Sequence, residues 1–248
     1  EVPEVTNRPF VKFIWGLVAR LCLPFYRHAY TVGPALAGIF EKKYGLRFGV
    51  VRNIPPLKSP PMHASEAGLL LYQGALNEGR GIEQLLEAMQ QLHGLELWLA
   101  GEGDLSDKLR QRAYELGVQD KVRFLGLIKP ADLPALTRQA WLGLNLLENK
   151  GLSYYYSLAN KFFDYIHAGL PCLTMNFPEY RALNAQHEVA VLLNQLSPDT
   201  IVAAIQNLRE NPAAYRRLQA ATTAARLDWN WEREEVGLLR CWTAVWQG

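Results

Sequence analysis

The sequence predicts an α/β protein built on a doubly wound, Rossmann-like parallel sheet. Short segments that are apolar almost throughout, such as GLLLYQG, LELWLAG and WLGLNLL, recur along most of the chain. Amphipathic stretches of about three helical turns separate them. Strands that are apolar on both faces are typical of a parallel sheet covered by helices on each side. Right-handed crossovers between such strands produce the doubly wound arrangement.

The composition is that of an ordinary globular protein. The chain has 248 residues, of which 49% are hydrophobic and 20% charged, enough for one large domain or two small ones. Cys22, Cys172 and Cys241 are far apart and lack the spacing of metal ligands, which favours the reducing cytoplasm. The segment nearest to a membrane span, FVKFIWGLVARLCLPF, is interrupted by Lys12 and Arg20. Because the chain begins without Met and nothing at its start resembles a signal peptide, we expect a fragment or a processed form.

The charge is unevenly distributed along the chain. Residues 1–56 hold eight Lys and Arg against three Asp and Glu, whereas the net charge of the whole chain is only +2. This small net charge gives no support for a nucleic-acid partner, and we expect none. The basic excess at one end favours an anionic surface there, such as a membrane face or a phosphate group.

The part of the chain before the regular pattern predicts two helices and a strand. Apolar residues recur at helical spacing over residues 10–21, and Pro24 ends this pattern. A second helix is predicted over residues 34–44, with Pro34 at its start and Gly45 as its stop signal. FGVVRN indicates a short strand. The four prolines of the following IPPLKSPP form a stiff connector, at which we place a domain boundary.

After this boundary, strands and helices alternate. The predicted strands are GLLLYQG, LELWLAG, KVRFLG, WLGLNLL, LPCLTM and EVAVLL. The predicted helices cover about 81–92, 105–116 and 131–139, a segment that starts near Asn160, and two segments that start near Pro198 and Pro212. The final WNWEREEVGLLRCWTAVW predicts an aromatic-rich amphipathic helix that packs across a larger body.

Two loops at predicted strand ends carry candidate binding residues, because ligands of doubly wound sheets bind at the carboxyl ends of the strands. In the first, YQGALNEGRG, the glycines Gly74, Gly79 and Gly81 allow close backbone approach. Arg80 offers a fork of donors to a phosphate group. The alternative is a glycine-rich turn with a solvated arginine.

The second loop, SLANKFFDY, is the stronger candidate. Ser157 is a candidate helix cap, and the backbone amides from Leu158 to Lys161 point their positive end outward. Lys161 adds a mobile cation, and Asp164 lies one turn further on the face of Asn160. A site that binds an anion at the helix start and has an acid one turn further on suits a sugar nucleotide. The acid accepts hydrogen bonds from the ribose hydroxyls. The alternative is a capped core helix with incidental surface polar residues.

Other catalytic motifs are missing from the sequence. It contains no DxD, HExxH or paired-cysteine motif, so no metal site is predicted, and no GxSxG elbow or GxxxxGK[ST] loop. Tyr154, Tyr155 and Tyr156 either stack on a base or sugar or close a loop over the core. His167 is expected to face solvent or to complete a structural hydrogen bond.

The order YQGALNEGRGIEQLLEAM, LWLAGEGD, VRFLGLI and SLANKFFDYIHAGLPCLTMNFPEY resembles the donor-binding half of group 1 (family 4) glycosyltransferases. The resemblance implies the GT-B fold of two Rossmann-like domains and a retaining reaction without metal. Residues 1–56 resemble a remnant of the acceptor-side domain, with its last helices and final strand. Residues 57–226 then form the donor nucleotide-sugar-binding domain, and residues 227–248 form a helix that crosses back to the first domain.

The resemblance also assigns roles to residues. In the family, a Gly-Arg pair followed by a Lys-Gly contacts the donor diphosphate. Here Gly74 is followed by Ala75, and Arg80 stands where the lysine is expected. Two family glutamates, eight residues apart, bracket the donor sugar and the ribose. Tyr156 and Asp164 occupy these positions, so the carboxylate for the ribose is kept and the anionic partner of the sugar is lost.

The resemblance thus implies an enzyme that moves a sugar from a nucleotide diphosphate, most simply UDP or GDP, to a glycan or lipid-linked acceptor. It implies a role in surface polysaccharide or glycoconjugate synthesis, in the cytoplasm or at the inner face of the membrane. Lys161 and Arg80 are the expected catalytic cations, assisted by the helix start from Ser157 to Asn160. No cofactor beyond the donor is expected. One alternative is a sugar-nucleotide epimerase on the same architecture. The other is a non-catalytic nucleotide-sugar-binding or scaffold module, which is favoured because this chain holds little of the acceptor domain.

Overall fold

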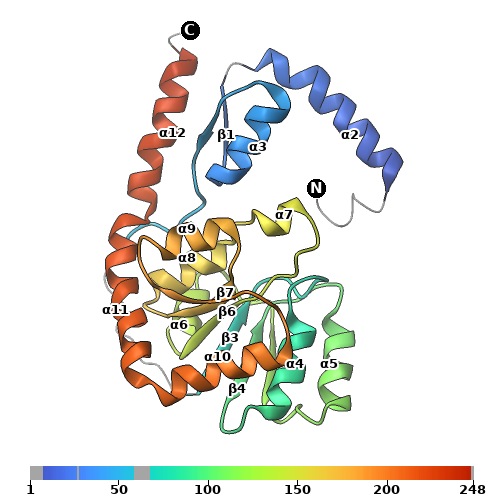
Figure 1. Cartoon of the computed structure of the whole chain (residues 1–248), viewed down its shortest axis with the longest axis vertical. Helices are drawn as coiled ribbons and strands as arrows, with labels where there is room; N and C mark the ends of the chain where they lie inside the picture. The colour runs from blue at the N-terminus through green and yellow to red at the C-terminus, as the bar shows by residue number, and fades with distance from the viewer. Residues whose placement is uncertain (1–7, 27, 59–67, 247–248) are drawn as a thin grey trace.

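The computed structural model of the chain describes residues 8–26, 28–58 and 68–246 (Figure 1). Its largest feature is a six-stranded sheet in the order β5-β4-β3-β6-β7-β8, in which all neighbouring strands are parallel. The strands are β3 (Leu69–Gln73), β4 (Glu96–Ala100), β5 (Val122–Gly126), β6 (Leu142–Asn145), β7 (Cys172–Met175) and β8 (Ala190–Leu193). These are the six apolar segments of the sequence, so the predicted fold class is confirmed.

The strand order places a topological switch at the centre of the sheet. From β3 the chain proceeds outward through β4 to β5, and then returns to form β6 on the other side of β3. Leu70 pairs with Leu142 across this switch. Loops that follow strands on the two sides of a switch diverge and leave a crevice at the carboxyl ends of the strands. The crevice here follows β3 and β6.

Helices cover both faces of the sheet. They are α4 (Ile82–Gln91), α5 (Ser106–Glu115), α6 (Leu133–Thr137), α7 (Leu152–Tyr155), α8 (Asn160–His167), α9 (Pro178–Asn184), α10 (Pro198–Glu210) and α11 (Pro212–Asp228). Helix α4 packs against α5 and α10, whereas α8 packs against α6 and α11. Helix α6 is shorter than predicted, because the residues on both sides of it form tight turns instead. Helices α7 and α9 are too short for apolar periodicity to reveal them.

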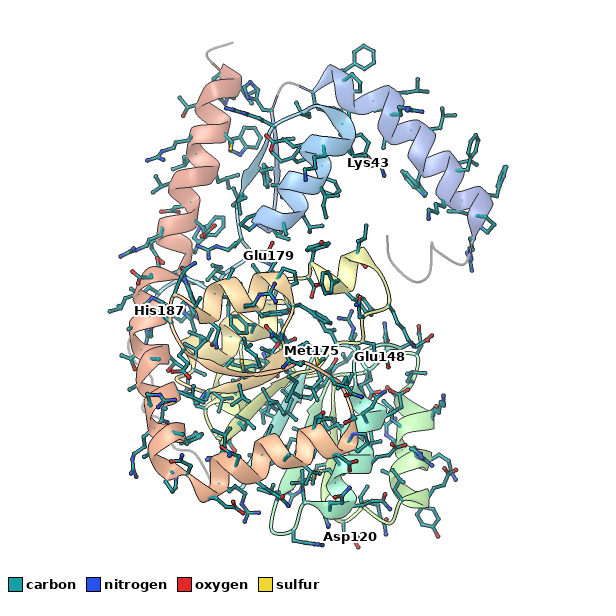
Figure 2. All side chains as sticks on the ribbon, in the orientation of Figure 1. Lys43, Asp120, Glu148, Met175, Glu179 and His187 are labelled. Atoms are coloured by element: carbon teal, nitrogen blue, oxygen red, sulfur yellow. The ribbon has the colours of Figure 1, made fainter. Side chains whose placement is uncertain are left out.

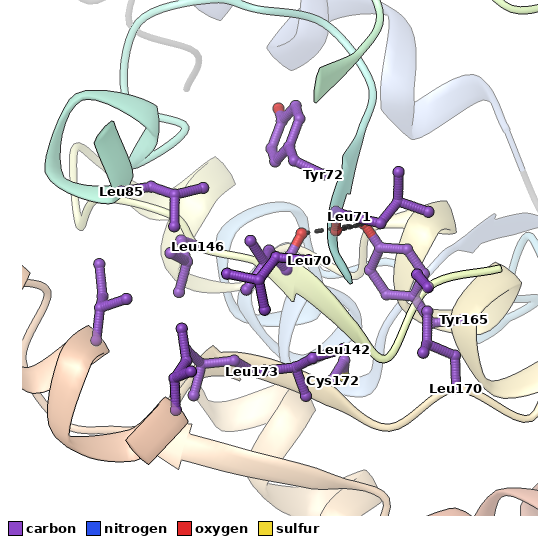
Figure 3. Packing of buried hydrophobic residues seen from close by; sticks show 14 of the residues in the cluster. Leu70, Leu71, Tyr72, Leu85, Leu142, Leu146, Tyr165, Leu170, Cys172 and Leu173 are labelled. Carbon is purple, nitrogen blue, oxygen red and sulfur yellow. Dashed lines mark hydrogen bonds between the residues drawn. The ribbon is translucent and has the colours of Figure 1, made fainter. Parts of the chain in front are cut away.

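The strands form the centre of the hydrophobic core. Leu70, Leu71, Leu142 and Leu173 are fully buried, and Figure 3 shows them packed together across three strands of the sheet. Apolar side chains on both faces of each strand explain why the strand sequences are apolar almost throughout and do not alternate.

A smaller unit precedes the sheet domain. Its elements are α2 (Pro9–Cys22), the 3-10 helix η1 (Leu23–Phe25), β1 (Ala29–Thr31), α3 (Pro34–Tyr44) and β2 (Phe48–Val50). Strands β1 and β2 pair in parallel, and β1 is too short to be recognised in the sequence. Helix α3 has the predicted ends. Gly45 terminates it with a φ of 67°, a left-handed conformation that favours glycine.

Helix α2 is exposed along its whole length. None of its residues is buried, and large apolar side chains such as Phe10, Phe13 and Trp15 are more than half exposed. Among the residues that the structure describes, no helix is both long enough and apolar enough to cross a bilayer.

Contacts at the linker and at α9 join the two units. Helix α12 (Trp231–Trp246) extends alongside the smaller unit and packs against β2 (Figure 1). Arg52, which follows β2, donates from Nε to Glu234 of α12 at 2.8 Å. Glu179 of α9 accepts a hydrogen bond from the backbone amide of Ala35 at 2.8 Å, so it holds the start of α3 (Figure 2). Residues 59–61 of the predicted proline-rich connector lie outside the described ranges.

Candidate functional site

Tyr165 fixes helix α8 against the two strands at the switch. Its buried hydroxyl lies 3.2 Å from the carbonyl of Leu71 in β3 and 3.1 Å from that of Leu144 in β6 (Figure 3). It also accepts a hydrogen bond from the amide of Gln73 at 3.2 Å. Gly143 leaves room for the ring, because a Cβ atom at that position would lie 2.5 Å from it. The rotation of α8 relative to the strand ends is therefore set by its own core residue.

The preceding residue in α8, Asp164, is held by a polar relay. Gln73, the last residue of β3 and itself buried, donates from Nε2 to Oδ2 of Asp164 at 2.9 Å. Thr137 of α6 donates to Oε1 of Gln73 at 2.9 Å and thereby fixes the orientation of the amide. Burial raises the pKa of Asp164 to about 6, and the hydrogen bond from Gln73 and the charge of Lys161 oppose this rise. Asp164 is thus an oriented carboxylate that is ionised at neutral pH.

Lys161, expected as a mobile cation, packs against an aromatic ring instead. Its Nζ atom lies 3.6 Å from the ring centre of Tyr72, a buried residue of β3. Burial and repulsion by Arg80 lower the pKa of Lys161 well below its usual value, and Asp164 partly opposes this effect. Within the described ranges, no carboxylate lies at ion-pair distance from the ammonium group. Gly74 makes space for it, because a Cβ atom there would lie 3.3 Å from Nζ.

Arg80 lies on the loop between β3 and α4, near Lys161. Its guanidinium carbon is 5.1 Å from the ring centre of Tyr154, and its buried Nε has no hydrogen-bond partner among the described residues. The glycines on either side, Gly79 and Gly81, have φ values of 77° and 69°. A Cβ atom on Gly79 would lie 2.6 Å from the Tyr154 ring, so the glycine permits this packing. The structure therefore brings the two predicted cations to one place.

The predicted helix cap is wrong. The residue before the first turn of α8 is Ala159, and no side chain caps this end. Ser157 lies outside the helix, and its hydroxyl is 3.4 Å from that of Tyr180. The Tyr180 hydroxyl accepts a hydrogen bond from the backbone amide of Ala159 at 3.0 Å, so this amide is satisfied without Ser157. Leu158 packs against the core, and Asn160 is exposed at the first position of the helix.

The three tyrosines before α8 make contacts with different parts of the site. Tyr154 faces the Arg80 loop and donates to the carbonyl of Glu78 at 3.1 Å. Tyr155 and Tyr156 contact each other edge to face, with ring centres 4.9 Å apart. His167 completes a structural hydrogen bond, as one of the two predictions for it states, because its Nε2 lies 2.7 Å from the carbonyl of Trp229.

A cavity of about 270 Å³ lies beside Asp164. Apart from Asp164, its walls include Pro130, Leu133 and Thr137 on one side, and the linker residue Pro55 on the other. Prolines make up much of the lining, which also holds Asp164 and the cations Lys58, Arg138 and Arg226. Apolar walls with a few polar groups suit a ligand with a flat ring and neighbouring hydroxyl groups. The described residues hold no cluster of His, Cys, Asp and Glu suited to a metal ion.

Sequence reasoning missed several residues of the site. Gln73, Thr137 and Tyr72 belong to it only through contacts between distant segments. Of these, Gln73 had a detectable signal, because it is the single polar side chain at the carboxyl end of an otherwise apolar or aromatic strand. The roles that the sequence assigns to Gly74, Arg80, Lys161 and Asp164 in binding stay predictions.

Residues 57–225 match the family model described as glycosyl transferases group 1. Among curated proteins, the chain is similar to the lipopolysaccharide core biosynthesis glycosyltransferase LpsD of Rhizobium meliloti. The two are 28% identical over 175 residues, which make up 70% of this chain and 48% of that protein. The chain spans less than half the length of the curated relatives it matches.

Solved structures share the fold. Sucrose-phosphate synthase from Thermosynechococcus elongatus has a TM-score of 0.80 at 17% identity, with 99% of this chain and 64% of that chain covered. Anabaena HepE in complex with UDP and glucose has a TM-score of 0.78 at 14% identity, with 95% and 67% covered. At these identities the likeness concerns the fold alone, and it confirms the expected GT-B architecture.

Proposed function

Because the chain belongs to the group 1 glycosyltransferases, we propose that its sheet domain binds the nucleotide-diphosphate sugar donor of a retaining, metal-independent transfer. The donor's diphosphate lies between Arg80 and Lys161, its ribose hydroxyls bind Asp164, and its base enters the cavity beside that residue. The acceptor is a glycan or a lipid-linked glycan.

The observation that supports this proposal best is a pair of neighbouring cations that form no ion pair with any carboxylate among the described residues. Lys161 is half-buried, Arg80 repels its ammonium group, and the nearby Asp164 only partly compensates. A cation that is largely withdrawn from water is costly unless an anion pairs with it. A diphosphate would supply the missing charge, raise the pKa of Lys161 again, and give the free Nε of Arg80 an acceptor.

The same cations have a role in the reaction. When the bond between the sugar C1 and the diphosphate oxygen breaks, negative charge builds up on the leaving diphosphate. The oxygen of the acceptor hydroxyl bonds to C1, and its proton passes to the departing diphosphate. Cations that are already in position stabilise this charge without reorganisation. Lys161 and Arg80 are pre-positioned by their aromatic neighbours, Tyr72 and Tyr154. Asp164 orients the donor and does not touch the reacting atoms.

The relatives support the choice of substrates. LpsD is named for lipopolysaccharide core biosynthesis, and the HepE structure holds UDP and glucose. A UDP-sugar and a growing surface glycan are therefore the substrates we propose for the whole protein. A lipid-linked acceptor would bring the protein to the inner face of a membrane, and the exposed aromatic side chains of α2, such as Phe13 and Trp15, would suit that location.

A thermal-shift titration with UDP, GDP, CDP and ADP tests the donor site. A nucleotide that binds only the folded state adds about 2.7 kcal/mol when its concentration is 100 times its dissociation constant. We expect one nucleotide to give a saturable shift that Arg80→Ala and Lys161→Ala each reduce. Arg216→Ala is the control, because Arg216 is an exposed arginine of α11, on a different part of the domain. The proposal fails if no nucleotide shifts the wild-type protein, or if both cation variants respond like the control.

A further inference from the structure

A cluster of charged side chains joins the loops that follow β3 and β6. Lys150, on the loop after β6, places its Nζ atom 2.7 Å from Oε1 of Glu78, on the loop after β3. The same atom lies 2.8 Å from Oε2 of Glu148, which precedes it on its own loop (Figure 2). The backbone amide of Glu148 donates to the carbonyl of Gly79 at 2.9 Å. These contacts therefore bridge the two loops at the switch of the sheet.

The bridge holds the segment that carries Arg80. This residue lies between Gly79 and Gly81, whose φ values are 77° and 69°. Glycines place few steric limits on the backbone, so the position of Arg80 depends on how its neighbours are held. The carbonyl of Glu78, two positions before it, accepts a hydrogen bond from the Tyr154 hydroxyl at 3.1 Å. The segment is thus attached on its N-terminal side to the part of the chain that follows β6.

Arg80 stays unpaired although a carboxylate is only two positions away. It forms no ion pair with any carboxylate among the described residues, and its buried Nε has no hydrogen-bond partner there. A guanidinium and a nearby carboxylate form a strong, often bidentate pair, so a free Glu78 would compete with other anions for Arg80. Instead Lys150 holds this carboxylate, and its hydrogen bond and charge lower the pKa of Glu78. Hydrogen bonds to Glu148 and Glu78 in turn raise the pKa of Lys150, so its ammonium group is charged at neutral pH.

We propose that Lys150 is a positioning residue, which holds Glu78 and Glu148 away from Arg80 and so keeps the guanidinium available to the donor diphosphate. Lys150 itself does not touch the donor. The inference deepens the proposed function and rests on it for the identity of the anion. An exposed ion pair with a structural role alone would change the stability slightly and leave both Arg80 and nucleotide binding as they are.

The NMR signal of the Arg80 Nε–H group in the ¹⁵N-labelled chain without nucleotide reports directly on its pairing. The signal is assigned by its absence in Arg80→Ala. We expect it to shift in Lys150→Met, because a freed carboxylate then pairs with the guanidinium. It should return toward its wild-type position when Glu78→Gln and Glu148→Gln are added to this variant. Lys150→Arg, which keeps the charge, and the control Lys42→Met, at an exposed position of α3, should leave it in place.

Calorimetric titration with UDP measures the consequence for binding. Lys150→Met should raise the dissociation constant about three- to tenfold, because a carboxylate then competes for one of the two cations. Lys150→Arg should bind like the wild type, and the added Glu78→Gln and Glu148→Gln should restore the affinity of Lys150→Met. In the Arg80→Ala background, Lys150→Met should change the dissociation constant less than about twofold, because its effect passes through Arg80.

The outcomes separate this proposal from the donor proposal. It is overturned if the Arg80 signal stays in place in Lys150→Met, or if Lys150→Met weakens UDP binding by the same factor with and without Arg80. It is also overturned if the glutamine substitutions fail to restore the affinity, since the loss would then come from loop structure and not from charge. A wild-type chain that binds no UDP but gives the expected NMR response would overturn the donor proposal alone.

Discussion

Replacing Asp164 with asparagine should stabilise the fold while it weakens nucleotide binding. Burial raises the pKa of this carboxyl group from 3.8 to about 6 in the folded protein. The folded state therefore holds the proton more tightly than the unfolded state, and ionisation of Asp164 destabilises the fold. Asparagine keeps an oxygen that accepts the hydrogen bond from Gln73 and carries no charge, so it avoids this cost.

The size and pH range of the effect follow from the two pKa values. A difference of about 2 pH units corresponds to about 3 kcal/mol at 1.36 kcal/mol per unit. The wild-type protein loses this stability as the pH rises from about 4 to about 6, and the loss is complete above that range. Because solvent reaches part of the carboxyl group, we expect Asp164→Asn to gain about 1–3 kcal/mol at pH 7 and nothing near pH 3.5.

Urea denaturation followed by tryptophan fluorescence measures this difference, since the chain has seven tryptophans. The measurement is made at several pH values between 3.5 and 7 on the wild type, on Asp164→Asn and on the control Asp120→Asn, whose side chain is exposed (Figure 2). Nucleotide affinity of the same samples at pH 7 should fall in the Asp164 variant alone. Equal stability of Asp164→Asn and wild type at pH 7, or a gain that persists at pH 3.5, would refute the reasoning.

Two other substitutions test the parts that position Asp164. Gln73→Met removes a hydrogen bond to a charged group, worth about 1.5–3 kcal/mol, so the pKa of Asp164 rises further and nucleotide affinity falls at pH 7 but recovers toward pH 9. Calorimetric titration between pH 7 and pH 9 measures the nucleotide affinity, and a pH profile like that of the wild type would contradict the prediction. Gly143→Ala places a Cβ atom against the Tyr165 ring and should cost about 1–3 kcal/mol of stability and also weaken nucleotide binding. Gly16→Ala is the control for Gly143→Ala in urea denaturation, because the added atom meets nothing within 4 Å. Equal denaturation midpoints for the two variants would show that α8 moves away from the added methyl group without loss of stability.

The strands and most of the long helices could be predicted from the sequence, because their signals are local. Each strand of the large sheet is an apolar run, and the ends of α3 are marked by Pro34 and Gly45 within the helix's own sequence. The elements that escaped prediction, β1, α7 and α9, are three to seven residues long and offer too few positions for a periodic pattern. The family resemblance then placed Arg80, Lys161 and Asp164 on one edge of the sheet by their order along the chain.

By itself, the sequence determined the fold class, the edge of the sheet that carries the candidate site and most of its charged residues. The tertiary structure alone decided how those residues are held. Gln73 reaches Thr137 and Asp164 across 64 and 91 positions of the chain, and Lys161 of α8 reaches Tyr72 in β3. The tertiary structure also showed that Ser157 does not cap α8, because the backbone amide of Ala159 donates its hydrogen bond to the Tyr180 hydroxyl instead. Periodicity and helix-end signals depend on neighbours along the chain, whereas burial, hydrogen-bond partners and pKa values depend on neighbours in space.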